Sequence, residues 1–243
     1  MIAPGPSWEL RCGDYRKVLS DVGQVDAVIC DPPYSERTHV GSDAVATSAT
    51  SADATERRSL GYSFWTPVEI AEIVARFAGV RGWFCAFTDS DLFNHWRGAF
   101  EDAGRYSFSP VPVLHHKPRL GGDGPGSGAV YLCVSRPRTK EFMSWGSLPC
   151  WYHSKPEKAS VMGAKPTSLM RAIIRDYSRP GDLVCDPCAG GATTLRAAVL
   201  EGRRAIGAEL DPATYAKAVD RLRGWGDMQS QVQPNLLEGL VGK

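Results

Sequence analysis

The sequence has almost no excess charge, because its 28 Lys and Arg nearly balance its 27 Asp and Glu. Its overall charge therefore gives no indication of a polyanionic partner. No uninterrupted apolar run approaches the roughly 18 residues that a membrane-spanning helix needs. The N-terminal residues also lack the basic start and apolar core of a signal peptide. We therefore expect a soluble, cytoplasmic protein with no membrane partner.

The cysteines do not form the pattern of a metal site or of a disulfide framework. There are seven, an odd number, and several lie in apolar runs, as buried free thiols do in a reducing compartment. Cys185-x-x-Cys188 is a close pair, but no second CxxC or HxxxH completes a zinc site. A thioredoxin-type pair would begin a helix, whereas this one follows a predicted strand. We expect neither a metal nor a redox centre.

Two common phosphate-binding loops, GxGxxG and GxxxxGK[ST], are also missing. The chain has instead a predicted strand–turn–helix–strand unit at 182–211, with Gly190 and Gly191 in its turn. Glycines let the backbone approach a ligand closely, and an acid about 20 residues further on, here Glu209, binds ribose hydroxyls in nucleotide-binding units. Asp186 would repel phosphate and favour an amine-bearing ligand with a ribose, which describes S-adenosylmethionine. The alternative is a tight turn with no ligand.

Short β-rich segments alternate with amphipathic helical segments along most of the chain. This alternation predicts one domain, residues 1–243, built on a mostly parallel sheet with helices on both faces. Residues 106–116 and 128–135 are predicted to form an antiparallel hairpin. Residues 35–60 have no usable periodicity, so we expect a mobile loop there. Strands of the parallel sheet are predicted at 8–12, 25–30, 82–87, 182–186 and 204–210.

The strand predicted at 25–30 ends on Asp31-Pro32-Pro33-Tyr34. The two prolines lack N–H groups and have a fixed φ, so they hold the turn rigid. Tyr34 can stack on a planar ring that bears an amino group, while Asp31 and the Pro32 carbonyl accept the two amino hydrogens. These acceptors would draw the hydrogens out of the ring plane and localise the nitrogen lone pair towards a methyl donor. The alternative is a proline-rich turn without chemistry.

The basic residues are concentrated in one part of the chain. Between residues 105 and 175, eleven Lys and Arg stand against three acids, so this segment has a net charge of about +8. Such a segment in a neutral protein is typical of a local nucleic-acid surface, and a solvated basic loop region is the alternative. We expect a DNA-recognition region at 115–164. Its candidate phosphate and groove contacts are His115, His116, Lys117 and Arg119.

Three stretches together resemble the amino-group DNA methyltransferases, which modify N6 of adenine or N4 of cytosine. They are DPPY at 31–34, the segment at 165–194 and IGAELDPATYAKAVDRL at 206–222. The catalytic tetrapeptide precedes the cofactor loop, an order that resembles the circularly permuted β class. The resemblance implies a Rossmann-like fold with a seven-stranded, mostly parallel sheet. One antiparallel strand is expected, at 128–135.

The resemblance also implies roles for individual residues. The implied catalytic residues are Asp31, Pro32, Pro33 and Tyr34. The implied cofactor-binding residues are Asp14, Asp31, Lys165, Asp186, Pro187, Cys188, Ala189, Gly190, Gly191, Thr193, Thr194 and Glu209. The loop departs from the usual DPFxGSGTT of the family at Cys188, Gly191 and Ala192. Ala192 replaces a glycine, and it would crowd the cofactor if its position requires a positive φ.

The activity that the resemblance implies is S-adenosylmethionine-dependent methylation of double-stranded DNA. The target base would be flipped out of the duplex and would receive the methyl group directly. DPPY resembles the adenine-modifying members more often, so we expect N6-adenine, with N4-cytosine as the alternative. A small enzyme gains DNA contacts by dimerising, so we expect a homodimer. The competing hypotheses are a glutamine or RNA methyltransferase, an inactive DNA-binding relative, and a nicotinamide dehydrogenase, which the missing GxGxxG disfavours.

Overall fold

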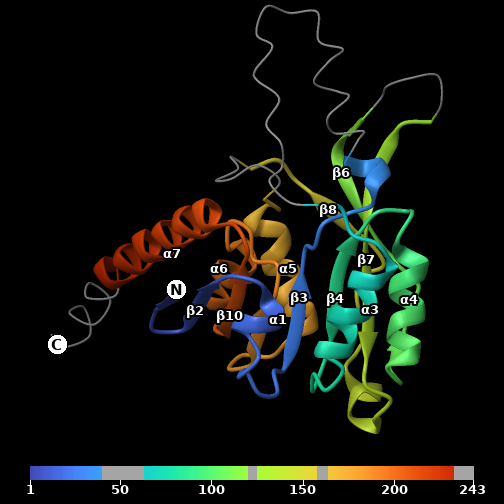
Figure 1. The fold of residues 1–243 in the computed structure, drawn as a ribbon, viewed down its shortest axis with the longest axis horizontal. Helices are drawn as coiled ribbons and strands as arrows, with labels where there is room; N and C mark the ends of the chain where they lie inside the picture. The colour runs from blue at the N-terminus through green and yellow to red at the C-terminus, as the bar shows by residue number, and fades with distance from the viewer. Residues whose placement is uncertain (40–62, 120–124, 158–163, 233–243) are drawn as a thin grey trace, which may run out of the picture.

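The computed structural model describes residues 1–39, 63–119, 125–157 and 164–232 (Figure 1). Strands and helices alternate along the chain, as the sequence pattern predicts. The strands are β1 (Ile2–Pro4), β2 (Trp8–Cys12), β3 (Ala27–Cys30), β4 (Phe84–Thr88), β5 (Tyr106–Ser107), β6 (Val111–Arg119), β7 (Ser127–Arg136), β8 (Tyr152–Ser154), β9 (Leu183–Asp186) and β10 (Arg204–Glu209). The helices are α1 (Tyr15–Val18), α3 (Pro67–Arg76), α4 (Phe93–Asp102), the 3₁₀ helix η1 (Lys140–Ser144), α5 (Thr167–Tyr177), α6 (Thr193–Leu200) and α7 (Pro212–Val232).

The strands of the described part of the chain form a single sheet. Its order is β1-β2-β10-β9-β3-β4-β7-β6-β8, with β5 also paired to β7. The five strands from β2 to β4 in that order are parallel, and β7 is antiparallel to both β4 and β6. The predicted hairpin and the predicted antiparallel strand at 128–135 are therefore confirmed.

The described residues form ten strands rather than the predicted seven. The seven longer strands, β2, β10, β9, β3, β4, β7 and β6, contain one antiparallel member, β7, as predicted. Three additional strands, β1, β5 and β8, are only two or three residues long. β1 is also antiparallel, to β2 at the sheet edge. Alternation of apolar and polar residues needs about four residues to be recognised, so the sequence gives no signal for strands this short.

Helices cover both faces of the sheet. The four residues of β3 are all buried, and they alternate between two cores. Ala27 and Ile29 pack in a core with α5, α6 and α7, whereas Val28 and Cys30 pack in a core with α1, α3 and α4. Burial on both faces is the reason that this strand reads as a continuous apolar run rather than an alternating one.

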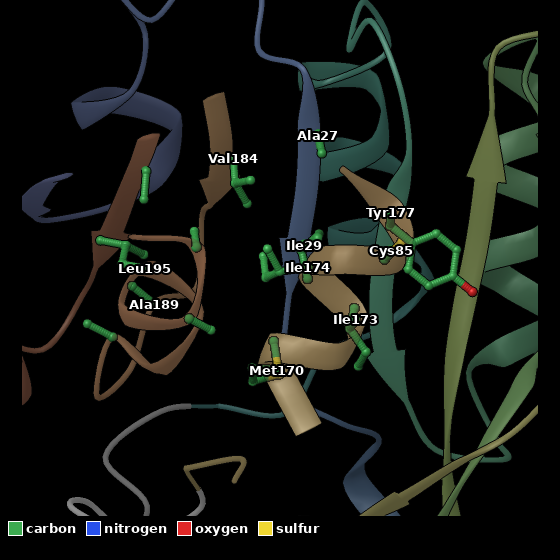
Figure 2. Close-up of a cluster of buried hydrophobic side chains, with 14 of the residues drawn as sticks. Ala27, Ile29, Cys85, Met170, Ile173, Ile174, Tyr177, Val184, Ala189 and Leu195 are labelled. Atoms are coloured by element: carbon green, nitrogen blue, oxygen red, sulfur yellow. The ribbon is translucent and has the colours of Figure 1, made fainter. Parts of the chain in front are cut away.

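Helix α5 illustrates how the sequence pattern directs the packing. Met170, Ile173, Ile174 and Tyr177 recur at helical spacing and form one buried face. Figure 2 shows this face lying over β3, with Ile174 beside Ile29. Each of these apolar side chains contributes roughly 1.5–3 kcal/mol on burial. The helix thereby fixes the segment that precedes it, which carries Lys165.

The chain leaves the middle of the sheet in two opposite directions. From β9 it continues through α6 to β10, while from β3 it continues through α3 to β4, and β9 and β3 are neighbours. Ligands of open α/β sheets bind outside the carboxyl ends of the strands at such a reversal. Most of the predicted 35–60 loop lies outside the described residues. Among the described helices, including the 21-residue α7, none has the length and apolarity needed to cross a bilayer.

Candidate functional site

Three acidic residues lie at one edge of the sheet. Glu209 ends β10, Asp186 ends β9 and Asp31 follows β3 directly. Because these neighbouring strands are parallel, their carboxyl ends meet at the same edge. The structure therefore brings together the two Cys-Asp-Pro turns that are separated by about 150 residues in the sequence. They meet at the reversal point between β9 and β3, where a ligand is expected.

Asp186 is the most strongly perturbed of these acids. Its side chain is 1% exposed, and burial raises its pKa to about 7. Hydrogen bonds from Thr194 and from the Cys188 N–H, at 3.0 Å, lower the pKa, but they do not offset burial. The negative charges of Asp31 and Glu209 raise the pKa further. A cationic group bound at this edge would relieve that repulsion.

The glycine-containing turn after β9 is held to β10 by hydrogen bonds from its backbone N–H groups. The Ala189 N–H donates to the Ala208 carbonyl at 2.8 Å, and the Gly190 N–H donates to Glu209 Oε2 at 2.8 Å. Gly190 and Ala192 have φ values of 51° and 56°. Ala192 therefore does occupy a left-handed conformation that favours glycine. Cys188 lies against the core beneath the turn.

Glu209 is fixed in orientation by backbone groups. Its Oε1 accepts the Asp211 N–H at 2.8 Å, and its Oε2 accepts the Gly190 N–H. Burial raises its pKa, while these two hydrogen bonds lower it. An ionised carboxylate has about four lone-pair directions, so two remain for the hydroxyls of a ligand. Among the described residues, no cluster of His, Cys, Asp or Glu has the arrangement of a metal site.

The DPPY turn forms a compact polar network with Lys165. The Tyr34 hydroxyl donates to Asp31 Oδ1 at 3.0 Å. Lys165 Nζ lies 2.5 Å from Asp31 Oδ2 and 3.0 Å from the Tyr34 hydroxyl. The same ammonium group lies 4.8 Å from the ring centre of Phe87, which is a cation–π distance. The ammonium group of Lys165 therefore lies at the Asp31 carboxylate, which was predicted to accept the amino group of a base.

Other predicted cofactor residues surround this centre. Asp14 caps α1 and forms an ion pair with Arg16 at 2.7 Å. The preceding Gly13 N–H donates to the Glu209 carbonyl at 2.8 Å, so Asp14 lies near the end of β10. Pro187 is buried in the turn. Pro32 is buried and Pro33 is half-buried.

Arg221 is a site residue that sequence reasoning did not identify. Its Nη1 donates to the Gly191 carbonyl at 2.6 Å and to Thr193 Oγ1 at 2.9 Å. It thereby ties α7 to the glycine turn. Arg221 lies within the 206–222 stretch that carries the resemblance, but the sequence does not indicate its contact with the glycine turn, which depends on how α7 packs.

The predicted DNA contacts lie on β6. This strand is antiparallel to β7, which is antiparallel to β4, so the end of β6 points towards the same edge as the DPPY turn. His115 pairs with Ser154 of β8, and His116 and Lys117 are exposed. Arg119 pairs with Ser127 of β7.

Part of the predicted 115–164 region contributes to the core instead. Phe142 and Trp145 pack on Trp83, with ring centres 5.9 and 5.6 Å away. The Trp145 indole N–H donates to the Asp176 carbonyl at 2.8 Å. Trp83 directly precedes β4, so this contact lies at the end of the sheet opposite to the three acids.

Residues 135–220 match the family model described as DNA methylase. DNA adenine methyltransferase YhdJ of Escherichia coli (strain K12) is 41% identical over 58 residues, which are 24% of this chain and 20% of that protein. Type II methyltransferase M.XycI of Xanthomonas campestris pv. cyanopsidis is 35% identical over 147 residues, 53% of this chain and 49% of that protein. The matches thus span at most about half the length of these curated relatives.

Solved structures share the fold over most of the chain. The M1.HpyAVI–SAM complex has a TM-score of 0.61 at 19% identity and covers 87% of this chain and 99% of its own. PvuII DNA methyltransferase, described as cytosine-N4-specific, has a TM-score of 0.61 at 15% identity, covering 88% and 85%. These likenesses agree with the mixed, mostly parallel α/β sheet described above.

Proposed function

We propose that this protein, a relative of the amino-group DNA methyltransferases, transfers a methyl group from S-adenosylmethionine to N6 of adenine in a specific sequence of double-stranded DNA. The observation that carries the proposal is the meeting of two turns at the reversal point of the sheet. One is the DPPY turn with Asp31, and the other is the glycine turn with Asp186. A base and a methyl donor bound to these turns would be neighbours, and proximity supplies much of the acceleration in such a transfer.

The residues of the glycine turn fit S-adenosylmethionine. Asp186 is buried and borders two further acids, so the site favours a ligand with positive groups and disfavours phosphate. Glu209 retains acceptor capacity for two ribose hydroxyls after its two backbone hydrogen bonds. Asp14, near the end of β10, would border the adenine of the cofactor. When bound, the cofactor supplies an electrophilic methyl group.

The DPPY turn is suited to hold the amino group of the target base. Asp31 and the Pro32 carbonyl would accept its two hydrogens, and Tyr34 would stack on the base after it leaves the duplex. Lys165 now donates to Asp31 Oδ2, so entry of an amino group at that oxygen requires the ammonium group to move. The neighbouring Tyr34 hydroxyl offers it an alternative acceptor at 3.0 Å.

The β6–β7 hairpin is the part of the predicted recognition region that best suits DNA. Its exposed His116 and Lys117 lie on the strand whose end points to the edge of the site. Phosphate contacts of this kind position a protein on the duplex without reading its sequence. We retain the homodimer and the permuted β class as parts of the proposal. The latter is supported by the position of DPPY ahead of the glycine turn in the chain.

N4 of cytosine is the second candidate target. It has the same chemistry, an amino group whose lone pair is delocalised into the ring, and PvuII DNA methyltransferase shares the fold. The DPPY sequence and the identity with YhdJ favour adenine.

The test is expression of the protein in a host that lacks amino-methylated DNA, followed by mass spectrometry of the DNA nucleosides. N6-methyladenine should appear with the wild-type protein and should be absent with Asp31→Ala, which should still bind S-adenosylmethionine in calorimetry. N4-methylcytosine would decide for the second candidate. If neither base appears while the purified protein binds the cofactor, the proposed activity is wrong.

A further inference from the structure

Asp89 is a buried carboxylate outside the site described so far. It follows β4, the strand next to β3 on the side away from the glycine turn. Its exposure is 7%. Burial alone would raise its pKa, but hydrogen bonds from Ser35 and Thr38 outweigh burial and lower the pKa. It is therefore an ionised group held in the interior by its donors.

One oxygen of Asp89 binds the segment that directly follows the DPPY turn. Oδ2 accepts the Ser35 N–H at 2.9 Å, the Ser35 hydroxyl at 2.5 Å and the Thr38 hydroxyl at 2.5 Å. Ser35 is itself buried, with 6% exposure. Hydrogen bonds to an ionised acceptor are about twice as strong as neutral ones, so Asp89 attaches this segment firmly to the end of β4.

The same contacts fix the backbone of Tyr34. Its carbonyl accepts the Trp65 N–H at 3.0 Å, and the next residue, Ser35, is bound by Asp89. On the other side of the turn, Cys30 is paired with Ala86 of β4. The DPPY turn is thus fixed at both ends to β4 and its extension, and the rotational freedom of Tyr34 is restricted accordingly.

Capping of helix α4 does not explain the whole arrangement. The N-cap of α4 is Leu92, and no side-chain hydrogen bond caps the helix. The other oxygen of Asp89, Oδ1, accepts the N–H groups of Asp91 and Leu92 at 3.1 and 3.2 Å in the turn before α4. In Asp89 the second oxygen collects three donors from a segment 51–54 residues away in the chain.

We propose that Asp89 is a positioning residue for methyl transfer, which acts through Ser35 to hold Tyr34 and Asp31 in the geometry that receives the flipped base. This inference rests on the proposed DNA methyltransferase activity. Asp89 contacts neither base nor cofactor in this role, so its loss should affect the reaction of bound DNA rather than the binding of S-adenosylmethionine.

The experiment compares the wild-type protein with three single variants and one double variant. Transfer of labelled methyl from S-adenosylmethionine to unmethylated genomic DNA gives kcat and KM, and calorimetry gives the dissociation constant of the cofactor. Asp89→Asn should lower kcat by about 100-fold, the effect of displacing a reacting group by about 1 Å, with cofactor binding unchanged. Glu101→Gln is the matched control, because Glu101 is an exposed acid near the C-terminal end of α4 that is paired with Arg97 and does not contact residues 35–38 in any described hydrogen bond. It should retain activity within about twofold, since surface pairs contribute little.

Ser35→Ala keeps the test informative if Asp89→Asn fails to fold. It removes one hydroxyl donor and should lower kcat by about tenfold, which corresponds to a hydrogen bond to a charged group. Added to Asp89→Asn, it should cause little further loss, because both act through one contact. Unchanged kcat in a folded Asp89→Asn protein, or in Ser35→Ala, would overturn the inference, as would a loss of cofactor binding equal to the loss of kcat. If the wild-type protein methylates no DNA, the proposed function itself fails and the inference fails with it.

Discussion

Asp186 should make the stability of this fold depend on pH near neutrality. Burial raises its pKa from 3.8 to about 7, so the folded protein holds this proton more tightly than the unfolded chain. Ionisation therefore opposes folding. The penalty is absent below about pH 4, grows as the pH rises from 4 to 7, and stays constant above pH 7.

The magnitude follows from the two pKa values. The difference between 3.8 and about 7 corresponds to about 4 kcal/mol of unfavourable free energy above pH 7. Part of this penalty is already present at pH 5, so the change between pH 5 and pH 8.5 is about 3 kcal/mol. Asp186→Asn removes the titration, but it places a new NH₂ donor in the interior, and a buried donor without an acceptor costs about 1–3 kcal/mol. At pH 5 the free energy of unfolding of the variant should be similar to that of the wild type or lower. At pH 8.5 it should be higher.

Urea unfolding followed by circular dichroism at both pH values measures this difference. Asp220→Asn is the control for replacing an Asp by Asn, because Asp220 is exposed on α7 and far along the chain from the glycine turn. Between pH 5 and pH 8.5, the stability of Asp186→Asn relative to wild type should improve by about 3 kcal/mol. Titrating groups that do not interact with Asp186 cancel in this comparison. An improvement below about 1 kcal/mol, or a change of opposite sign, would refute the view that Asp186 is a buried carboxylate with a raised pKa.

Substitutions at two further positions, Tyr34 and Ala192, test the neighbouring parts of the site. Tyr34→Ala should raise the KM for DNA by about 10–100-fold, because stacking of a base on an aromatic ring contributes about 1–3 kcal/mol. Tyr34→Phe keeps the ring and should have the KM of the wild-type protein. Equal KM values for the two variants would contradict the stacking role. Ala192→Gly should change the free energy of unfolding by less than about 1 kcal/mol, because relief of the left-handed strain is offset by loss of a buried methyl group and by greater freedom of the unfolded chain. Ala192→Val should destabilise by about 2 kcal/mol or more in thermal unfolding, and a stable Val variant would show that the φ at this position is not positive.

The sequence was sufficient to predict the parts of the fold that are long and buried on a regular pattern. β3 and β7 are recognisable because each contains at least four consecutive apolar residues between turn signals. The short strands β1, β5 and β8 have only two or three residues each. Their pairing depends on where the longer strands lie. Nothing in their own sequence distinguishes them from loops.

The same distinction applies to the site. Asp31 and Asp186 are predictable because each ends a strand and belongs to a motif whose chemistry can be stated from the residues alone. Lys165 belongs to such a segment as well, but its position on Asp31 Oδ2 depends on where α5 packs. Arg221 and Asp89 act through contacts with residues 28–54 positions away in the chain, and such pairs leave no spacing signal within one sequence.

Asp89 also shows where sequence interpretation can be extended. The segment Thr-Asp-Ser-Asp at 88–91 follows a strand predicted to be parallel, and it reads most simply as a helix cap. The end of a parallel strand is also an edge where ligands bind. β4 is next to β3, so any acid there lies close to whatever follows the DPPY turn. A hydroxyl residue directly after the tetrapeptide, here Ser35, is then a natural partner for that acid. Asp89 and Ser35 can both be read from the sequence, but only the adjacency of β3 and β4 shows that they form a pair.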